Sequence, residues 1–409
     1  MADFPVERVR QMFPALQRSG SPMFFDNAAG AQIPQRVFDA INEHLLTRNV
    51  QRGGPYRESK EVDATIERAR KTVATFLNAA DPNEVAFGMN ATSFIRLVSL
   101  GIGQSLGDRR EIIVTDLDHE ANVATWLALE RDGATIRWWK LRDDGLLHVE
   151  DLEQQLSHKT RLVACTVASN ALGTLVDVAG VARSAHAAGA EVFLDAVHYG
   201  PHGLIDVQQW QCDYLVCSGY KIFGPHMGFL WGRQAVLDAL PTFREDFIPN
   251  RAPSKIEAGT FVYENVAGMN AAIEYLAELG GSGDGDMRQA LVRAMQAIRE
   301  YETTLSRALL EGISAIRHAV VYGIKDTKAL HQRVPTLCFN VGSVPPETVS
   351  FGLADRNIAA RHGHMYSPRL MRRLGLSLDR GVVRASLVHY NTLEEIEKFV
   401  RAVEEIGRA

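Results

Sequence analysis

Short apolar runs alternate with longer amphipathic segments along most of this chain. The runs at 111–115, 161–167 and 191–195 are rich in apolar residues, which predicts strands buried on both faces. In the segments 62–77 and 178–188, apolar residues recur at helical spacing. Repeated strand, turn and helix units are typical of a mostly parallel sheet covered by helices, with ligand groups at the carboxyl ends of its strands. The pattern therefore predicts an α/β fold.

The same pattern predicts the remaining elements and a division into domains. Further strands are expected at 85–88, 136–141, 319–322, 336–341 and 382–386, with a sheet or hairpin piece at 146–149. Further helices are expected at 94–102, 152–156, 267–279, 287–311, 346–356 and 393–406. We predict an N-terminal arm at 1–20, a large domain at 21–265, connecting helices at 266–310 and a smaller α+β domain at 311–409.

Composition and charge narrow the class of protein. With 409 residues, 46% of them hydrophobic, the chain is long enough for two domains with a large buried interior. Its net charge of −5 is spread along the sequence, so we expect no nucleic-acid partner. Because no run has the length of a membrane span and the start lacks the features of a signal peptide, we expect no membrane partner and a cytoplasmic location. The four cysteines lack metal-ligand spacing, so we expect reduced, mostly buried thiols and no metal.

Two predicted strands lead to residues that suggest chemistry. The run 213–217 enters a Ser/Gly/Pro turn that carries Lys221, and the run 191–195 ends in Asp195. A lysine desolvated at the end of a buried strand has a lowered pKa, and its free amine can form a Schiff base. A lone lysine at a strand end is more often a surface residue whose amine reaches water. Pyridoxal phosphate requires a lysine for its aldehyde and an acid beside its ring nitrogen, and these two residues supply that pair.

Two further segments carry groups suited to anionic ligands. Strand 85–88 is followed by Ala91 and Thr92 at a predicted helix start, where free N–H groups and a hydroxyl suit a phosphate. A plain helix cap has the same pattern. Arg384 lies in a predicted strand, where its guanidinium would either bind a carboxylate through two parallel hydrogen bonds or form a structural salt bridge.

In this order along the chain, these residues resemble the class V aminotransferase family of fold-type I pyridoxal-phosphate enzymes, and within it the cysteine desulfurases. The resemblance extends over nearly the whole chain and includes His119 and the segments 168–174 and 257–260. It implies an aspartate aminotransferase-like fold, in which the large domain holds a mostly parallel seven-stranded sheet. It also implies pyridoxal 5'-phosphate as cofactor, a small amino acid as substrate and a homodimer with its active sites at the interface.

The resemblance implies a role for individual residues. It makes Lys221, His119 and Asp195 the catalytic residues: the lysine joins the cofactor, the histidine stacks on its ring and the aspartate holds its ring nitrogen. The residues expected to bind the cofactor are Ala91, Thr92, His119, Asn170, Asp195, His198, Ser218, Tyr220, Lys221 and, across the dimer interface, Gly259 and Thr260. The residues expected at the substrate are Arg384, which would bind its carboxylate, and Arg52, Asn27, Ala29, His364 and Tyr366.

One loop departs from the desulfurase pattern. Desulfurases carry a sulfur-accepting cysteine in a frame like Arg-x-Gly-x-His-Cys, whereas residues 361–366 read Arg-His-Gly-His-Met-Tyr, with Tyr366 in the place of the cysteine. A persulfide requires a thiolate, which neither tyrosine nor methionine provides. We therefore predict a carbon–sulfur β-lyase that acts on cysteine or a cysteine conjugate by α,β-elimination through a lysine aldimine. Class V amino-group transfer or decarboxylation in a biosynthetic pathway remains an alternative, as does a non-catalytic scaffold in sulfur transfer.

Overall fold

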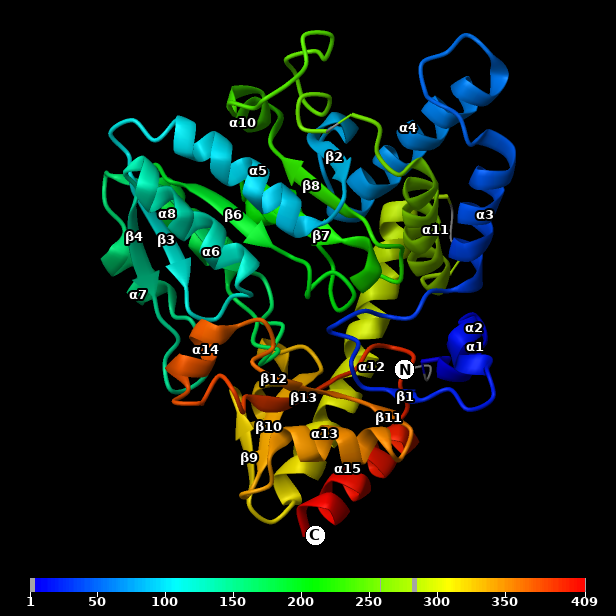
Figure 1. Cartoon of the computed structure of the whole chain (residues 1–409), viewed down its shortest axis with the longest axis vertical. Helices are drawn as coiled ribbons and strands as arrows, with labels where there is room; N and C mark the ends of the chain where they lie inside the picture. The colour runs from blue at the N-terminus through cyan, green and yellow to red at the C-terminus, as the bar shows by residue number, and fades with distance from the viewer. Residues whose placement is uncertain (1–3, 258, 282–284, 409) are drawn as a thin grey trace.

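The computed structural model describes residues 4–257, 259–281 and 285–408. Residues 1–3 of the expected arm, residue 258 of the expected interface segment and residue 409 lie outside this part. The described chain forms a large domain around a seven-stranded sheet and a smaller domain around a four-stranded sheet (Figure 1). The long helix α12 (Met287–Ala315) joins the two domains.

The central sheet has the strand order β2-β8-β7-β6-β5-β3-β4. Its strands are β2 (Val85–Gly88), β3 (Glu111–Thr115), β4 (Thr135–Trp139), β5 (Thr160–Thr166), β6 (Glu191–Asp195), β7 (Tyr214–Ser218) and β8 (Gly228–Gly232). The strands from β7 to β4 pair in parallel, whereas β8 runs antiparallel to β2 and β7. The predicted α/β fold with a mostly parallel seven-stranded sheet is confirmed.

Alternate residues of the central strands enter two different apolar cores. In β5, Leu162 and Ala164 belong to one core, and Val163 and Cys165 belong to the other. The first core also contains residues of α5 (Ala91–Gln104), α6 (Ala121–Leu127) and α10 (Gln234–Ala239). The second contains residues of α3 (Gln35–Arg48), α4 (Arg57–Leu77), α7 (Val149–Gln155), α8 (Val178–Ala187), α9 (Val207–Trp210) and α11 (Tyr263–Leu279). Because helices bury both faces of the sheet, its strands read as continuous apolar runs.

The smaller domain is built on an antiparallel sheet with the order β12-β13-β10-β9. Its strands are β9 (Ala319–Tyr322), β10 (Thr336–Val341), β12 (Arg361–Gly363) and β13 (Val382–Ser386). Helices α13 (Pro346–Ala354) and α15 (Leu393–Arg408) and the second half of α12 pack on this sheet around a core that includes Leu309 and Phe399. Helix α14 (Pro368–Arg373) turns back to the large domain, where Arg373 Nε donates to the Leu141 carbonyl at 2.7 Å.

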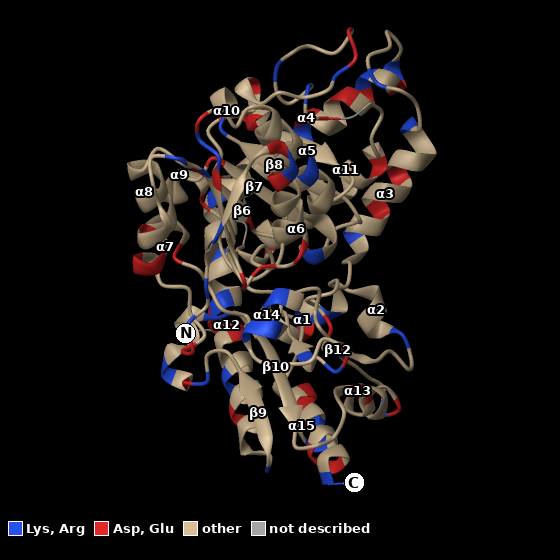
Figure 2. Ribbon diagram, turned by 60° about the vertical axis from the view of Figure 1, so that its left-hand side comes forward, with Lys and Arg blue, Asp and Glu red and all other residues tan. Residues whose placement is uncertain are grey.

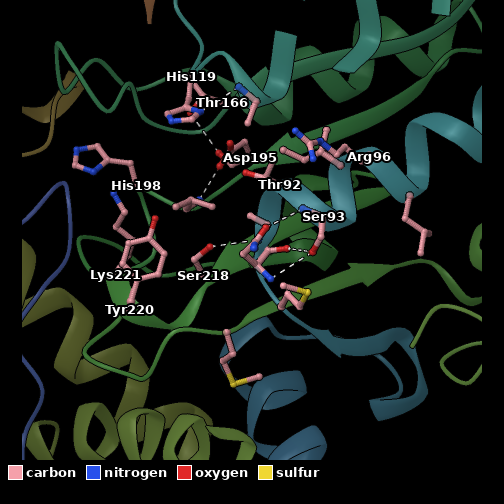
Figure 3. A pocket seen from close by; sticks show the side chains of 18 of the residues that line it. Thr92, Ser93, Arg96, His119, Thr166, Asp195, His198, Ser218, Tyr220 and Lys221 are labelled. Atoms are coloured by element: carbon pink, nitrogen blue, oxygen red, sulfur yellow. Dashed lines mark hydrogen bonds between the residues drawn. The ribbon is translucent and has the colours of Figure 1, made fainter. Parts of the chain in front are cut away.

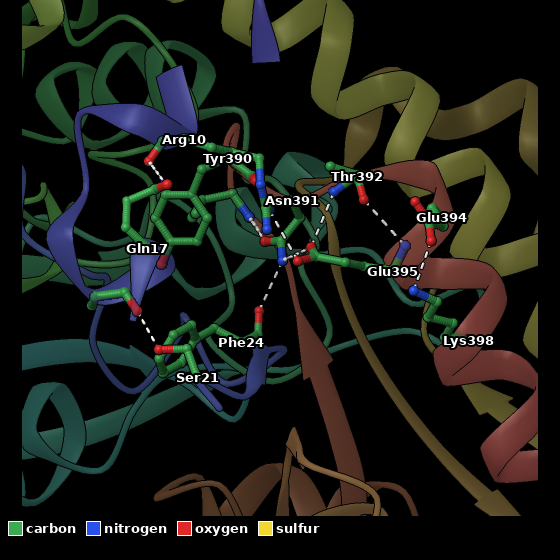
Figure 4. Close-up of polar contacts among 12 residues, drawn as sticks. Arg10, Gln17, Ser21, Phe24, Tyr390, Asn391, Thr392, Glu394, Glu395 and Lys398 are labelled. Carbon is green, nitrogen blue, oxygen red and sulfur yellow. Dashed lines mark hydrogen bonds and ion pairs between the residues drawn. The ribbon is translucent and has the colours of Figure 1, made fainter. Parts of the chain in front are cut away.

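The N-terminal segment crosses from one domain to the other. After α1 (Val6–Gln11) and α2 (Pro14–Gln17), β1 (Met23–Phe24) pairs in parallel with β11 (Ile358–Ala359) of the smaller domain. Arg10 Nη1 donates to the Tyr390 carbonyl at 2.7 Å, and Asn391 Nδ2 donates to the Phe24 carbonyl at 3.0 Å (Figure 4). A bridge then pairs Asp26 with Ser386 at the end of β13. The segment therefore brings Asp26 close to the strand that carries Arg384.

Charged residues are distributed over both domains, with acidic and basic residues interspersed along the surface helices (Figure 2). On α15, for example, Lys398 Nζ lies 2.7 Å from Oε1 of Glu394, one helical turn away. Among the described helices, none is both long and apolar enough to cross a membrane.

The sequence prediction was wrong at 146–149, where a sheet or hairpin piece was expected. This segment leads out of a turn, and α7 begins at Val149. Its backbone groups are bonded locally, since Arg142 N–H donates to the Leu146 carbonyl at 3.0 Å and Trp139 Nε1 donates to the His148 carbonyl at 2.9 Å. The prediction also missed β8, a five-residue strand with a glycine at each end.

Candidate active site

A cavity of about 1140 Å³ opens at the carboxyl ends of the parallel strands. Strands β5, β6 and β7 each place their last residue on it, namely Thr166, Asp195 and Ser218. The first turn of α5 also lines the cavity, and the segments after β3 and β7 add His119 and Lys221 (Figure 3). The cavity thus lies where the strand pattern predicted ligand groups.

Asp195 is a buried carboxyl group at the end of β6. It is 7% exposed, and its Oδ1 accepts a hydrogen bond from the Val197 N–H at 2.9 Å. Burial raises its pKa to about 6, while the Val197 N–H and the charge of Lys221 act in the opposite direction. A cationic ligand atom beside this carboxyl group would stabilise its charged form, because opposite charges favour ionisation.

Lys221 lies in the 3-10 turn Gly219–Lys221, directly after β7. Its side chain is buried, and its Nζ donates to the backbone carbonyl of Ala28. Burial lowers the pKa of Lys221 to about 7, and Arg384 adds to this effect while Asp195 opposes it. A large share of the amine is therefore unprotonated near neutral pH, as a nucleophilic lysine requires. Lys221 is therefore not the surface residue that a lone lysine at a strand end usually is.

The start of α5 offers donors to an anion at one end of the cavity. Asn90 caps the helix, since its side chain accepts from the Ser93 N–H at 2.8 Å and the Ser93 hydroxyl bonds back to the cap. The Ala91 N–H is 3.4 Å from Ser218 Oγ, and Thr92 lines the cavity next to it. Backbone N–H groups and hydroxyls at a helix N-terminus favour an anion such as a phosphate.

His119 and His198 line the cavity as neutral imidazoles. Burial lowers the pKa of His119 to about 4, with further lowering by Lys221 and Arg384, and its Nδ1 accepts from the Ala121 N–H at 3.1 Å. Burial also lowers the pKa of His198, whose Nε2 lies 2.9 Å from Thr336 Oγ1 of the smaller domain. An uncharged ring can pack flat on an aromatic cofactor without losing the hydration of an ion.

Arg384 is buried beside the cavity and already has partners. Its Nη2 lies 2.9 Å from Asp26 Oδ1, and its Nη1 donates to the Asn170 carbonyl at 3.0 Å. The other carboxylate oxygen of Asp26 pairs with Arg361, at 3.0 Å from Nε and 2.9 Å from Nη2. The sequence prediction named Arg384 and missed Asp26, although a carboxylate directly before the small-residue turn at 27–30 was a usable signal.

Asn170 connects the cavity to the loop after β12. Its Nδ2 donates to the Met365 carbonyl at 2.7 Å, and its Oδ1 accepts from Ser367 Oγ at 3.2 Å. In the same loop, Tyr366 is 50% exposed, and its ring centre lies 5.7 Å from that of His119. The loop therefore lies against the histidine side of the cavity.

The structure brings most of the predicted residues together. Those that line the cavity are Ala29, Ala91, Thr92, His119, Asn170, Asp195, His198, Ser218, Tyr220 and Lys221. The side chain of Asn27 is bonded to Tyr390, Asn391 and the Phe24 and Ser386 carbonyls, which makes it a link between segments. Further from the cavity, Arg52 pairs with Asp63 at 3.1 Å and Thr260 Oγ1 accepts from Gln51 Nε2 at 2.7 Å, next to Gly259. His364 lies beside Tyr366 in the loop, with ring centres 6.0 Å apart.

All four cysteines are free and buried. Burial raises the pKa of each thiol, and that of Cys338 reaches about 12. A persulfide-forming cysteine must be a thiolate that meets the substrate. The segment 361–368, which lies next to the cavity, contains no cysteine.

Known proteins resemble this chain in sequence and in fold. The family model described as Aminotransferase class-V matches residues 23–399. This chain belongs to the class V aminotransferase family. Among its relatives, the aminotransferase-like protein FGM3 of Gibberella zeae (strain ATCC MYA-4620) is 35% identical over 415 residues, and a cysteine desulfurase of Enterobacter sp. (strain 638) is 35% identical over 425 residues. Both alignments cover 98% of each chain. The apo structure of a cysteine desulfurase from Thermococcus onnurineus NA1 has a TM-score of 0.88 at 27% identity and covers 100% of this chain and 99% of that chain.

Class V aminotransferases and cysteine desulfurases use pyridoxal 5'-phosphate, so this chain is a pyridoxal-phosphate enzyme. Its own residues fit the group. The buried Asp195 suits a protonated ring nitrogen, Lys221 with its lowered pKa suits an aldehyde, and the first turn of α5 suits a phosphate. The fold-type I architecture and the cofactor expected from the sequence are both confirmed.

Proposed function

We propose that this class V enzyme is a carbon–sulfur β-lyase acting on cysteine or a cysteine conjugate. One observation carries the proposal: the loop beside the cavity presents Tyr366 and no thiol, while every cysteine is buried with a raised pKa. Sulfur transfer to a protein cysteine requires an accessible thiolate. α,β-Elimination requires none, because the sulfur leaves with the substrate's own electrons.

The residues of the cavity suffice for this reaction. Pyridoxal phosphate, when bound, withdraws electrons from the α-carbon of the substrate. The buried amine of Lys221 would take the proton from that carbon. Asp195 keeps a positive charge on the ring nitrogen, and the neutral ring of His119 covers one side of the cavity. The mechanism therefore depends on residues that hold and move protons.

Arg384 positions the substrate through its carboxylate. Its Nη1 and Nη2 each have a protein partner, and its buried Nε has no partner among the described residues. A substrate carboxylate bonded to the remaining donors would make two parallel hydrogen bonds, which fix its orientation. This grip would fix the orientation of the bonds at the α-carbon of the substrate.

Other reactions of the family use the same residues. Amino-group transfer is the second candidate, and the name of the aminotransferase-like relative from Gibberella zeae supports it. Decarboxylation also needs a lysine, an acid and a carboxylate-binding arginine. A non-catalytic scaffold needs none of Lys221, Asp195 and Arg384. The first two line one cavity and Arg384 is bonded to the lining residue Asn170, which argues against that alternative.

We also propose that two chains complete each active site. Gly259 and Thr260 lie outside the chain's own cavity, and Thr260 is exposed. The mouth of the cavity carries exposed apolar side chains, with Met89 75% and Phe243 91% exposed. Apolar groups of this size at a cavity mouth suit a partner surface, and a second copy would bring its own Thr260 to the phosphate end.

Product analysis tests the proposed reaction. The purified, cofactor-loaded protein is mixed with L-cysteine, and pyruvate, sulfide, ammonia and alanine are measured, with free pyridoxal phosphate as a blank. Pyruvate with sulfide and ammonia is expected. Alanine as the product would overturn the proposal, because it would mean that one of the buried thiols accepts sulfur. The absence of both products with L-cysteine and with S-methyl-L-cysteine would also overturn it and would favour amino-group transfer.

A further inference from the structure

Four side chains form a continuous row of polar contacts from Arg384 to the loop after β12. Arg384 pairs with Asp26, and Asp26 pairs with Arg361. Arg361 Nη1 then donates to the hydroxyl oxygen of Tyr366 at 3.1 Å. Every link has the length of a hydrogen bond. The hydroxyl of Tyr366 is therefore fixed relative to the guanidinium proposed to bind the substrate carboxylate.

Tyr366 also lies near the catalytic side of the cavity. Its ring centre is 5.7 Å from that of His119 and is tilted by 31° to it. Burial raises the pKa of Tyr220, and Tyr366 is close enough to contribute to this shift, after Asp195 and Cys217. Since His119 and Tyr220 both line the cavity, the ring of Tyr366 lies next to its lining residues.

The backbone of the loop holds the phenol in place. Met365 and Tyr366 both have left-handed backbone conformations, with φ of 52° and 57°. Non-glycine residues adopt this conformation seldom, and two in succession persist only when the surroundings hold them. Here the Met365 carbonyl accepts from Asn170 Nδ2 at 2.7 Å, and the Tyr366 carbonyl accepts from the Glu120 N–H at 2.8 Å. These bonds tie the loop to two segments of the large domain.

We propose that Tyr366 is the general acid that protonates the departing sulfur. The inference rests on the proposed β-lyase function. Lys221 takes the α-proton, and the electron pair of that bond becomes the second bond between Cα and Cβ as the Cβ–S bond breaks. The sulfur leaves with the pair of the broken bond and takes the hydroxyl proton of Tyr366. The enamine that remains of the substrate is hydrolysed by water to pyruvate and ammonia.

Arg361 stabilises the phenolate that this step leaves behind. Its Nη1–H already points at the hydroxyl oxygen, and a hydrogen bond to an ionised acceptor is stronger than one to a neutral acceptor. Its guanidinium carbon also lies 6.0 Å from the centre of the Tyr366 ring. Because the side chain is half exposed, water returns the proton to Tyr366 before the next turnover, and the hydroxide so formed takes up the α-proton that Lys221 releases.

Two leaving groups test the role. S-methyl-L-cysteine expels a thiolate that benefits from protonation, whereas β-chloro-L-alanine expels chloride, which leaves without a proton. In Tyr366→Phe, we expect kcat for pyruvate formation from S-methyl-L-cysteine to fall by roughly 100-fold or more, the size typical of a lost general acid. We expect kcat with β-chloro-L-alanine to stay at the level of the unmodified enzyme. Tyr322→Phe, on β9 of the smaller domain, is the matched control and should change neither rate.

The outcomes separate the two proposals. If the unmodified enzyme forms pyruvate from S-methyl-L-cysteine and Tyr366→Phe retains that rate, the acid role is overturned and the β-lyase function stands. Equal losses with both leaving groups would also overturn the acid role, because they would show that the hydroxyl only positions the substrate or the loop. If the unmodified enzyme eliminates neither cysteine nor S-methyl-L-cysteine, the β-lyase function fails and the acid role fails with it. The visible spectrum of the bound cofactor shows that the variant is folded and loaded.

Discussion

Asp26 and Arg384 form an ion pair of 2.9 Å between the segment after β1 and strand β13. The arginine is 1% exposed, and Asp26 also binds Arg361 through its second oxygen. One carboxylate therefore balances two guanidinium groups at the place where a substrate carboxylate is proposed to bind. The site holds a surplus of positive charge that an anionic substrate would reduce.

Asp26→Asn should destabilise the free enzyme by about 2 kcal/mol, because it leaves the buried Arg384 without its charged partner. A bound substrate carboxylate would restore a negative charge, so the rise in melting temperature on adding an amino acid should be larger in the variant than in the unmodified enzyme. Thermal unfolding with and without L-alanine measures both effects. Asp151→Asn, which breaks the more exposed pair with Arg142, is the control and should shift the melting temperature only slightly. A ligand-induced rise no larger than that of the unmodified enzyme would contradict this account.

Lys221→Ala should abolish turnover and the visible absorbance that the cofactor shows when it is joined to the lysine. No other amine lines the cavity among the described residues, so no neighbour replaces it. Absorbance spectra measure the bound cofactor, and pyruvate assays measure turnover. Lys328→Ala, at an exposed position of the smaller domain, should keep both properties. Normal turnover by Lys221→Ala would exclude the proposed proton transfer.

Cofactor uptake by the cofactor-free protein should depend on pH with a midpoint near the pKa of Lys221. Burial lowers this pKa to about 7, and only the unprotonated amine, which predominates above the pKa, attacks an aldehyde. The rate at which visible absorbance appears should therefore rise from about pH 6 and level off near about pH 8. With an ordinary lysine, the rate would instead keep rising to about pH 10, because the fraction of free amine increases up to that pH. A rate that continues to climb beyond pH 9 would show that Lys221 is not desolvated in the free enzyme.

Phe247→Glu should weaken the proposed dimer. Phe247 is 82% exposed in the loop that follows α10, the loop that also carries Phe243 at the cavity mouth, so a charge there would be buried against a partner. Light scattering after size exclusion should give about twice the 45.2 kDa chain mass for the unmodified protein and a smaller mass for the variant. Phe351→Glu, on the exposed side of α13, is the control and should leave the mass unchanged. If the unmodified protein elutes as a monomer, the proposal that two chains complete each active site is contradicted.

The periodicity of apolar residues and the types of residue predicted much of the fold and part of the candidate site. The strands at 85–88, 111–115, 319–322, 336–341 and 382–386 appear with the predicted bounds, because runs buried on one or both faces leave a clear apolar pattern. Asp195 and Lys221 were found because Asp195 ends such a run and Lys221 follows one, and the carboxyl ends of parallel strands meet at one edge. The glycine-flanked β8 was missed because a short strand with few β-branched residues gives little signal.

The sequence by itself determined most of the strands and helices and which residue types could serve pyridoxal phosphate, because these depend on local pattern and on chemistry that each residue carries alone. Only the tertiary structure decided which charges meet. Asp26 reaches Arg384 because the segment after β1 pairs with the end of β13 through the Asp26–Ser386 bridge, and Arg361 joins them from an adjacent strand. Such contacts join residues more than 300 positions apart, so no local pattern records them. The pKa values of Lys221 and His119 likewise follow from burial and from charges that the fold brings close.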